Sequence, residues 1–304
     1  MVFVYFLASV LIVLVLGLAT SWIDRKVTAL VQARVGPPWY QPLADIAKLL
    51  GKETLLPGEG RAMGFLAAPL AALATAGVAG AILVGSLLAG RDFVGDLVVL
   101  LYFFTLPAAA LILGACASGN PVSVVGASRE MKMMLAYELP LLIVMVTLFL
   151  RAGGVFRIDN LLAFQAEHGW MLWSFSGAAG FIVALLCTQA KLGLVPFDAP
   201  EAEQELMGGV LCEYSGAPLA VWKLTRAMLL CLFCIFLGVA FLGGFSLDGW
   251  GVLWSALKYV AILVPLVLIR NTNPRLRIDQ ILRFFWGPMT VLAIAGLLLA
   301  VRGW

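Results

Sequence analysis

Charged residues are scarce in this sequence: Asp, Glu, Lys and Arg together make up 12% of its 304 residues, about half the share found in soluble domains. Hydrophobic residues make up 62%, well above the usual share. A chain with so little polar surface cannot cover an apolar core in water, which excludes an ordinary soluble protein. The net charge of +3 at pH 7 is also too small for the basic surface that binding of nucleic acid requires.

Cysteine and histidine, the usual metal ligands, are also rare. The five cysteines are too scattered for a disulfide framework, and Cys231 and Cys234 form a C-x-x-C pair within an apolar run, without a second pair. We interpret both as small apolar residues on a helix, and the single histidine, His168, as a surface residue. The sequence has no iron–sulfur or zinc spacing, no phosphate-binding loop and no dinucleotide-binding glycine pattern. We therefore expect no cofactor, metal or redox centre in this chain.

Long apolar runs are what the sequence has in abundance. Windows of about 19 residues give eight candidate spans, at 2–23, 64–89, 97–117, 133–152, 171–190, 217–242, 252–270 and 284–302. Runs of this length and uniformity predict helices, because strands of a membrane barrel are short and alternate apolar with polar residues. We predict an all-α polytopic membrane protein with about eight transmembrane helices, forming a single integral membrane domain over residues 1–304.

The segments between the spans differ in charge. Twelve Lys and Arg residues fall in four loops that would share one side of the membrane, at 24–63, 118–132, 191–216 and 271–283. Only three fall in the segments of the other side, at 90–96, 151–170, 243–251 and 303–304. Positive charge accumulates in cytoplasmic loops. We therefore predict that the four basic loops are cytoplasmic and that both termini lie outside the cytoplasm.

The first basic loop contains an amphipathic pattern from Pro42 to Glu53. Its apolar residues share one helical face and its charged residues another, and Pro42 suits the first turn of a helix. Two interpretations are open: an interfacial helix that lies on the membrane, and a surface on which a peripheral protein docks. The density of polar residues around this helix favours docking.

The segment from Pro196 to Gly216 concentrates negative charge. It contains five of the seventeen acidic residues of the chain and lies between two apolar runs, where carboxylates are costly unless paired or wet. Past Pro200 we expect Glu201 and Glu205, four residues apart, to share one helix face. Like charges so close disfavour joint ionisation, so one of them would take up and release a proton. The alternative is a solvated acidic face.

Glu138 lies near the beginning of the fourth predicted span, nine residues beyond Arg129. A carboxylate there is neutralised, paired or in contact with water. One interpretation is a structural ion pair with Arg129 or Lys132, and the other is an ionisable step in a charge path. Lys223 and Arg226, three residues apart in the sixth span, are close enough in sequence to the acidic segment to act as its counter-charges.

Short motifs distributed along the whole chain resemble one known family. They are Asp24-Arg25-Lys26, Arg34-Val35-Gly36-Pro37, Gln41-Pro42-Leu43-Ala44-Asp45 with Lys48 and Lys52-Glu53, Ala136-Tyr137-Glu138, Pro196-Phe197-Asp198, Glu201-Ala202-Glu203, Glu213-Tyr214-Ser215-Gly216, and Pro274-Arg275-Leu276-Arg277 with Asp279-Gln280. In this order they resemble the complex I subunit that forms the quinone chamber, called the H subunit in bacteria and subunit 1 in mitochondria. The same superfamily includes membrane subunits of energy-converting group 4 [NiFe]-hydrogenases, such as formate hydrogenlyase.

Two features make the chain more similar to the hydrogenase branch. Only Pro38-Trp39-Tyr40 separate Gly36-Pro37 from Gln41-Pro42, where complex I subunits typically have a longer insertion, and Gly126-Ala127-Ser128-Arg129-Glu130 resembles the hydrogenase sequences. Ala136-Tyr137-Glu138 and Pro274-Arg275 resemble both branches. The resemblance implies a non-redox subunit of a membrane-bound, formate hydrogenlyase-like hydrogenase complex in the inner membrane of a prokaryote. The alternative is the quinone-chamber (H) subunit of NADH:quinone oxidoreductase.

The resemblance also implies partners and residue roles. Peripheral large and small hydrogenase subunits and iron–sulfur proteins would carry the nickel–iron centre and the clusters, and antiporter-like subunits would be neighbours in the bilayer. The expected path for H⁺ or Na⁺ comprises Glu138, Asp198, Glu201, Glu203, Glu205, Glu213, Lys223 and Arg226. The expected surface for the redox module comprises Arg25, Gln32, Arg34, Asp45, Lys48, Arg129, Arg275 and Arg277.

Two other classes of function can be compared with this one. A stand-alone secondary transporter would have inverted repeats and paired broken helices, which the sequence does not show. A purely structural membrane anchor would not need so many carboxylates at membrane depth.

Overall fold

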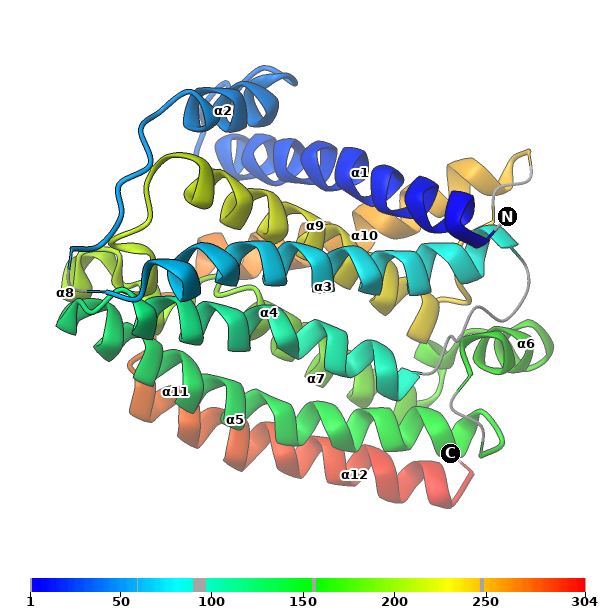
Figure 1. The fold of residues 1–304 in the computed structure, drawn as a ribbon. Helices are drawn as coiled ribbons and strands as arrows, with labels where there is room; N and C mark the ends of the chain where they lie inside the picture. Colours follow the sequence, from blue (N-terminus) through cyan, green and yellow to red (C-terminus); the bar gives the residue numbers. More distant parts are fainter. Residues whose placement is uncertain (1, 59, 90–96, 155–156, 247–248, 304) are drawn as a thin grey trace.

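The fold is seen in a computed structural model, which describes residues 2–58, 60–89, 97–154, 157–246 and 249–303, without the side chains of residues 2–5, 88, 89 and 203. Long helices lie side by side and form one bundle (Figure 1). The long helices are α1 (Val2–Val31), α3 (Ala62–Ala89), α4 (Leu97–Ala117), α5 (Pro121–Arg151), α7 (Phe175–Lys191), α9 (Gly216–Phe241) and α10 (Gly251–Thr272). The last long helix joins α11 (Ile278–Phe284) to α12 (Thr290–Val301) through a π-helical turn, Phe285–Met289. Shorter helices are α2 (Gln41–Leu50), α6 (Ile158–His168), α8 (Glu203–Leu206) and the 3₁₀ turns Met171–Trp173, Ala199–Glu201 and Gly209–Leu211.

The prediction of an all-α polytopic membrane protein is confirmed. Within the described residues, seven helices are long and apolar enough to cross a membrane. They are α1, α3, α4, α5, α9, α10 and the continuous run from α11 to α12. The eighth predicted span corresponds to α7, whose 17 residues extend about 25 Å, somewhat less than a hydrocarbon core of about 30 Å.

Three of the predicted loop boundaries are wrong, and all three err in the same direction. The first helix continues to Val31, the segment 118–132 is mostly helix because α5 begins at Pro121, and α11 begins at Ile278 within the segment 271–283. The start of α5 has a local cause: the Asn120 side chain accepts a hydrogen bond from the backbone N–H of Val122 at 2.8 Å, and Pro121 suits the first turn. Hydropathy windows find only the apolar part of a helix that continues past the membrane. The predicted loop 90–96 lies outside the described residues.

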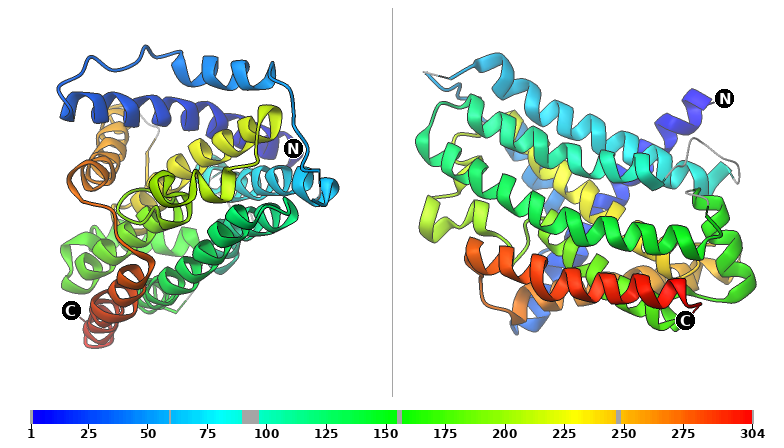
Figure 2. Two further views of the ribbon diagram at one scale, coloured as in Figure 1. Left: turned by 90° about the vertical axis from the view of Figure 1, so that its left-hand side faces the viewer. Right: turned by 90° about the horizontal axis from the view of Figure 1, so that it is seen from below.

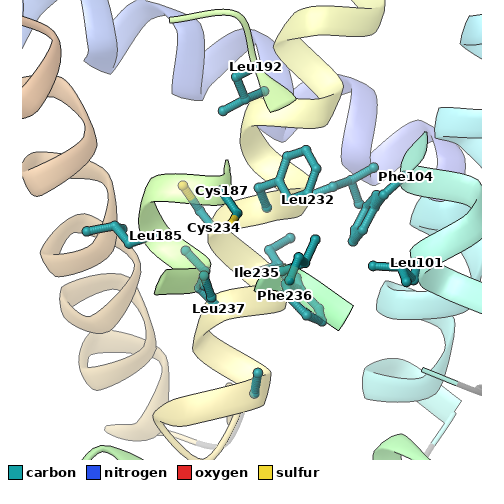
Figure 3. Close-up of a cluster of buried hydrophobic side chains, with 14 of the residues drawn as sticks. Leu101, Phe104, Leu185, Cys187, Leu192, Leu232, Cys234, Ile235, Phe236 and Leu237 are labelled. Atoms are coloured by element: carbon teal, nitrogen blue, oxygen red, sulfur yellow. The ribbon is translucent and has the colours of Figure 1, made fainter. Parts of the chain in front are cut away.

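Helix α9 forms the middle of the bundle. In its most apolar window 83% of the residues are buried, against 22% in α1 and α10, so α9 is a span surrounded by other helices rather than by lipid. Figure 3 shows residues of α4 and α7 gathered around it, among them Phe104 and Cys187 beside Phe236 and Cys234. The rings of Phe104 and Phe233 lie 4.4 Å apart. This core fixes the position of the first half of α9, where Arg226 lies.

The two ends of the bundle differ. Helices α2 and α8 and the start of α5 lie at one end, whereas α6 and both chain termini lie at the other (Figure 1). The view along the bundle shows α2 outside the bundle, beside α1 (Figure 2). All the candidate docking residues and most of the candidate path residues therefore belong to one end, which we call the charged end. Residues 2 and 303 share the opposite end, as the predicted topology requires.

Candidate functional site

The acidic segment folds as a series of short turns at the charged end. A 3₁₀ turn, Ala199–Glu201, is separated from α8 by Ala202, whose backbone angles (φ −52°, ψ 99°) interrupt the helix. The prediction that Glu201 and Glu205 share one helix face is therefore wrong. Each carboxylate instead pairs with an arginine of a different helix: Arg226 Nη1 of α9 donates to Glu201 at 2.8 Å, and Arg129 Nη1 of α5 donates to Glu205.

Asp198 ties the acidic segment to the loop before α11. Its side chain is 10% exposed, and its Oδ2 lies 2.8 Å from Arg275 Nε. The backbone N–H of Leu276 donates to the Pro196 carbonyl at 3.0 Å, which fixes the same two segments next to each other. Arg275 was expected on the docking surface, and the structure gives it a second role as the partner of a path carboxylate. The neighbouring Arg277 is exposed, as a docking residue would be.

Glu138 pairs with a residue that the sequence did not suggest. Its Oε2 lies 3.1 Å from Nζ of Lys191, at the C-terminal end of α7, and the lysine side chain is only 2% exposed. The expected structural pair with Arg129 or Lys132 is wrong, because Arg129 binds Glu205 and Lys132 is exposed on another face of α5. A residue more than fifty positions away in sequence can be found as a partner only when the packing of α5 on α7 is known.

Glu213 lies just before α9 and accepts a hydrogen bond from the Asn120 side chain, the residue that caps α5. Next to it, the Tyr214 ring stacks on Phe65 with 4.1 Å between centroids, and its hydroxyl donates to the Phe65 carbonyl at 3.2 Å. Burial raises the pKa of Tyr214 to about 12. The side chain of Glu203 lies outside the described part of the structure.

Two neighbouring cavities are both lined by Asp198 and Glu201. The larger, of about 410 Å³, is lined by eight charged side chains: Asp24, Arg25, Asp198, Glu201, Lys223, Arg226, Arg270 and Arg275. The smaller, of about 40 Å³, is lined by Glu130, Lys191 and Trp222 together with Asp198, Glu201 and Arg226, which belong to both cavities. Each is large enough for water, and polar groups line both. Lys223, predicted as a counter-charge, faces the larger cavity.

Glu130 and Lys191 are site residues that the sequence analysis did not assign. Glu130 is 5% exposed and lines the smaller cavity, seven positions before Tyr137, which is fully buried on α5. The sequence feature that could have identified Glu130 is the helix-capping pattern Asn120-Pro121. A helix that begins there places Glu130, Met133 and Tyr137 on one face, the face that packs inward. Lys191 gave no signal of its own, because the sequence does not reveal which helix packs beside it.

The expected docking residues divide into paired and exposed groups. Arg25 Nη1 of α1 donates to Asp45 of α2 at 2.6 Å, and Gln41 also donates to that carboxylate at 2.9 Å. The hydrogen bond from Arg25 lowers the pKa of Asp45. The ion pair between Arg25 and Asp45 therefore holds α2 on α1. Arg34 is exposed at the mouth of a third cavity, of about 350 Å³, that Gln32, Arg25 and Arg270 also line.

The amphipathic helix predicted from Pro42 onward is observed as α2. It packs on α1 and α9, with Pro42 buried and Lys48 exposed. Leu43 and Leu50 of its apolar face are 61% and 58% exposed, so this face is not covered by the described part of the chain. An uncovered apolar face fits both interpretations of the helix, contact with lipid and contact with a partner. Among the described residues, no group of three or more His, Cys, Asp and Glu side chains lies close enough together to hold a metal ion.

Comparison with known proteins gives consistent similarities over the whole length. The sequence model of the NADH dehydrogenase family matches residues 4–301. The H subunit of the NADH-quinone oxidoreductase of Bacillus cytotoxicus is 34% identical over 315 residues, covering 98% of this chain and 93% of the relative. The protein of the same name from Bacillus thuringiensis subsp. konkukian is 33% identical with the same coverage. A chain of the membrane-bound sulfane sulfur reductase, an archaeal respiratory membrane complex, has a TM-score of 0.85 at 26% identity and covers 98% of this chain and 99% of its own length.

Proposed function

Since the chain belongs to the NADH dehydrogenase subunit 1 family and is a multi-pass membrane subunit of the complex I-like type, we propose that it couples a peripheral redox module to ion movement. In this proposal the charged end docks the module, and the carboxylates of the two cavities carry the ion into the membrane. One observation supports the proposal most directly: Asp198, Glu201 and Glu138 each pair with a cation, and the first two line cavities that continue toward the third.

The arrangement suits ion transfer rather than anchoring alone. A buried carboxylate is costly in the membrane, and pairing offsets that cost only when the geometry is good. A hydrophobic anchor would be at least as stable without these pairs. Carboxylates that line water-sized cavities can change their protonation state and their partners as the charge at the docked module changes. Their titration is then coupled, so that a change at Glu201 alters the charge on Asp198 and Glu130.

For the branch of the superfamily, we propose a membrane-bound [NiFe]-hydrogenase complex similar to formate hydrogenlyase. The short connection Pro38–Tyr40, in place of a longer insertion, supports it, as do the charged linings of the cavities, which are poorly suited to the apolar tail of a quinone. Partner subunits would carry the nickel–iron centre and the iron–sulfur clusters, and antiporter-like subunits would adjoin it in the bilayer. The curated relatives favour the second candidate, the quinone-chamber (H) subunit of NADH:quinone oxidoreductase.

For the orientation, we propose that the charged end faces the cytoplasm, with both termini outside. The twelve-to-three division of Lys and Arg between the loops supports this. Reporter enzymes fused at loop 24–63 and at α6 test it. A reporter active only in the cytoplasm should work at loop 24–63 and fail at α6, and the reverse pattern would refute the orientation.

Glutamine substitutions test the coupling role. Glu138→Gln and Glu213→Gln keep the size of the side chain and remove its titration. We expect both variant complexes to assemble and to retain hydrogenase activity with soluble dyes, while ion pumping falls by about tenfold or more, the scale of a lost proton-transfer step. Full coupling in both single variants and in the double variant would exclude a proton-carrying role.

A further inference from the structure

We propose that Lys191 is a proton-relay residue, which passes a proton between the smaller cavity and Glu138. This inference rests on the proposed function and adds a residue that the family resemblance did not suggest. It concerns the gap between the carboxylates of the cavities and the one carboxylate that lies deeper along α5.

The position of Lys191 connects two groups that do not otherwise meet. Its side chain lines the smaller cavity together with Glu130 and Glu201. Its Nζ also lies 3.1 Å from Glu138 Oε2. Glu138 is not among the residues that line either of the two cavities. Lys191 is therefore in contact with both the cavity and the deeper carboxylate.

A direct transfer along α5 is too long. Glu130 and Glu138 are eight residues apart on this helix, which corresponds to about 12 Å along its axis. Proton transfer needs the two heavy atoms within hydrogen-bond reach, or one water between them. A lysine whose flexible side chain comes from α7, the neighbouring helix, supplies a group within that reach of Glu138.

The surroundings hold the lysine where the relay needs it. The side chain is 2% exposed, and Nζ lies 5.3 Å from the centroid of the Tyr137 ring, within the range of a cation–π contact. The ring and the carboxylate stabilise the ammonium, whereas burial disfavours it. Burial thus brings the neutral form closer in free energy to the charged form, while the ring and the carboxylate keep the ammonium accessible, and a relay residue requires both forms.

The proton transfer conserves atoms and charge and needs no further reactant. One N–H bond of the Lys191 ammonium breaks and an O–H bond forms on the Glu138 carboxylate, which leaves a neutral amine beside a neutral acid. The amine then takes a proton from water in the smaller cavity, and that water recovers its proton from Glu130 or Glu201. The net result is one proton moved from the cavity to Glu138, with Lys191 returned to its starting form.

Arginine distinguishes a relay from a structural ion pair. Lysine loses its proton readily when buried, whereas arginine stays protonated in proteins. Lys191→Arg thus keeps the positive charge that pairs with Glu138 and removes the ability to release a proton. If Lys191 serves only to neutralise Glu138, arginine should restore function. If it relays protons, arginine should preserve assembly and abolish transfer.

The test uses the whole complex reconstituted into vesicles, with proton uptake followed by a pH-sensitive dye and redox activity followed with a soluble acceptor. We expect Lys191→Arg to keep the redox activity, while its rate of proton uptake falls by about tenfold or more. The double variant Lys191→Met with Glu138→Gln replaces the pair by neutral groups, and it should assemble and show the same loss. Lys132→Arg, an exposed lysine on α5, is the matched control and should pump normally.

The outcomes separate the relay from the function on which it rests. Normal proton uptake in Lys191→Arg, while Glu138→Gln alone is uncoupled, would overturn the relay and leave the proposed function intact. Normal uptake in Glu138→Gln would overturn both. If Lys191→Arg does not assemble, Lys191→Gln with Glu138 intact decides: full uptake there overturns the relay, and loss of uptake with intact redox activity supports it.

Discussion

The ion pair between Asp198 and Arg275 makes a quantitative prediction about how the acidic segment is held. Breaking a fully buried pair costs about 3–5 kcal/mol, whereas an exposed pair contributes about 0–1 kcal/mol. Asp198 is 10% exposed and Arg275 41%, so this pair lies between the two limits. We expect a coupling energy of about 1–2 kcal/mol between the two side chains, obtained from a double-mutant cycle of Asp198→Asn and Arg275→Gln.

The assay is thermal unfolding of the purified complex in detergent. Each single variant should lower the unfolding midpoint by a few degrees, at roughly 2 °C or more per kcal/mol for a large domain. Asp198→Asn should cost more than Arg275→Gln, because Asp198 is the more buried of the two side chains. The double variant should be little worse than Asp198→Asn alone. Glu167→Gln, exposed at the opposite end, is the control and should leave the midpoint unchanged. Additive effects in the cycle, within about 0.5 kcal/mol, would show that the pair does not hold the segment.

Three further predictions concern the docked helix, the packing and the branch. Because Arg25 lowers the pKa of Asp45, their pair should stabilise α2 at neutral pH and lose that contribution as the pH falls through the lowered pKa, below about 4; Asp45→Asn should make proteolysis of α2 faster at pH 7 and remove its acid dependence. Gly114→Val should lower the unfolding midpoint by several degrees, since a side chain there meets the Tyr214 hydroxyl, whereas Gly58→Ala has open space. Quinone-site inhibitors should leave the activity of the assembled complex unchanged, and strong inhibition at low concentration would favour the quinone-reducing branch.

The membrane spans could be predicted because their signal is local. An apolar run of sufficient length has to cross the bilayer as a helix, whatever its neighbours are. The helix ends could not be predicted equally well, since α5 begins at Pro121 through a cap formed by Asn120, twelve residues before the apolar window. The central position of α9 in the bundle could not be predicted from the sequence either. Its composition resembles that of α10, and only the packing shows that α9 is surrounded by helices of this chain whereas α10 is mostly exposed on the surface of the bundle.

The carboxylates of the site could be predicted, but their partners could not. Their cost at membrane depth identified Asp198, Glu201 and Glu138 from the sequence alone. Their pairing depends on contacts between helices distant in sequence, so the expected pairs of Glu138 with Arg129 or Lys132 were wrong. The expected repulsion between Glu201 and Glu205 was wrong for a different reason. It assumed a continuous helix through Ala202, whose extended backbone turns the two side chains toward different arginines.

The pairing that the structure adds changes how the proposed ion transfer has to be understood. An isolated carboxylate in the membrane would be neutral, and charging it would cost several kcal/mol. Here Glu201 and Arg226 lie beside Glu130, so a proton that arrives at Glu201 releases an arginine that Glu130 can then bind in its ionised form. This exchange between Glu201 and Glu130 replaces one paired carboxylate by another and creates no unpaired charge at that step. The cations among the carboxylates are thus as necessary for the proposed path as the carboxylates themselves, which is why Lys191 and Arg226 are the residues whose replacement should be most informative.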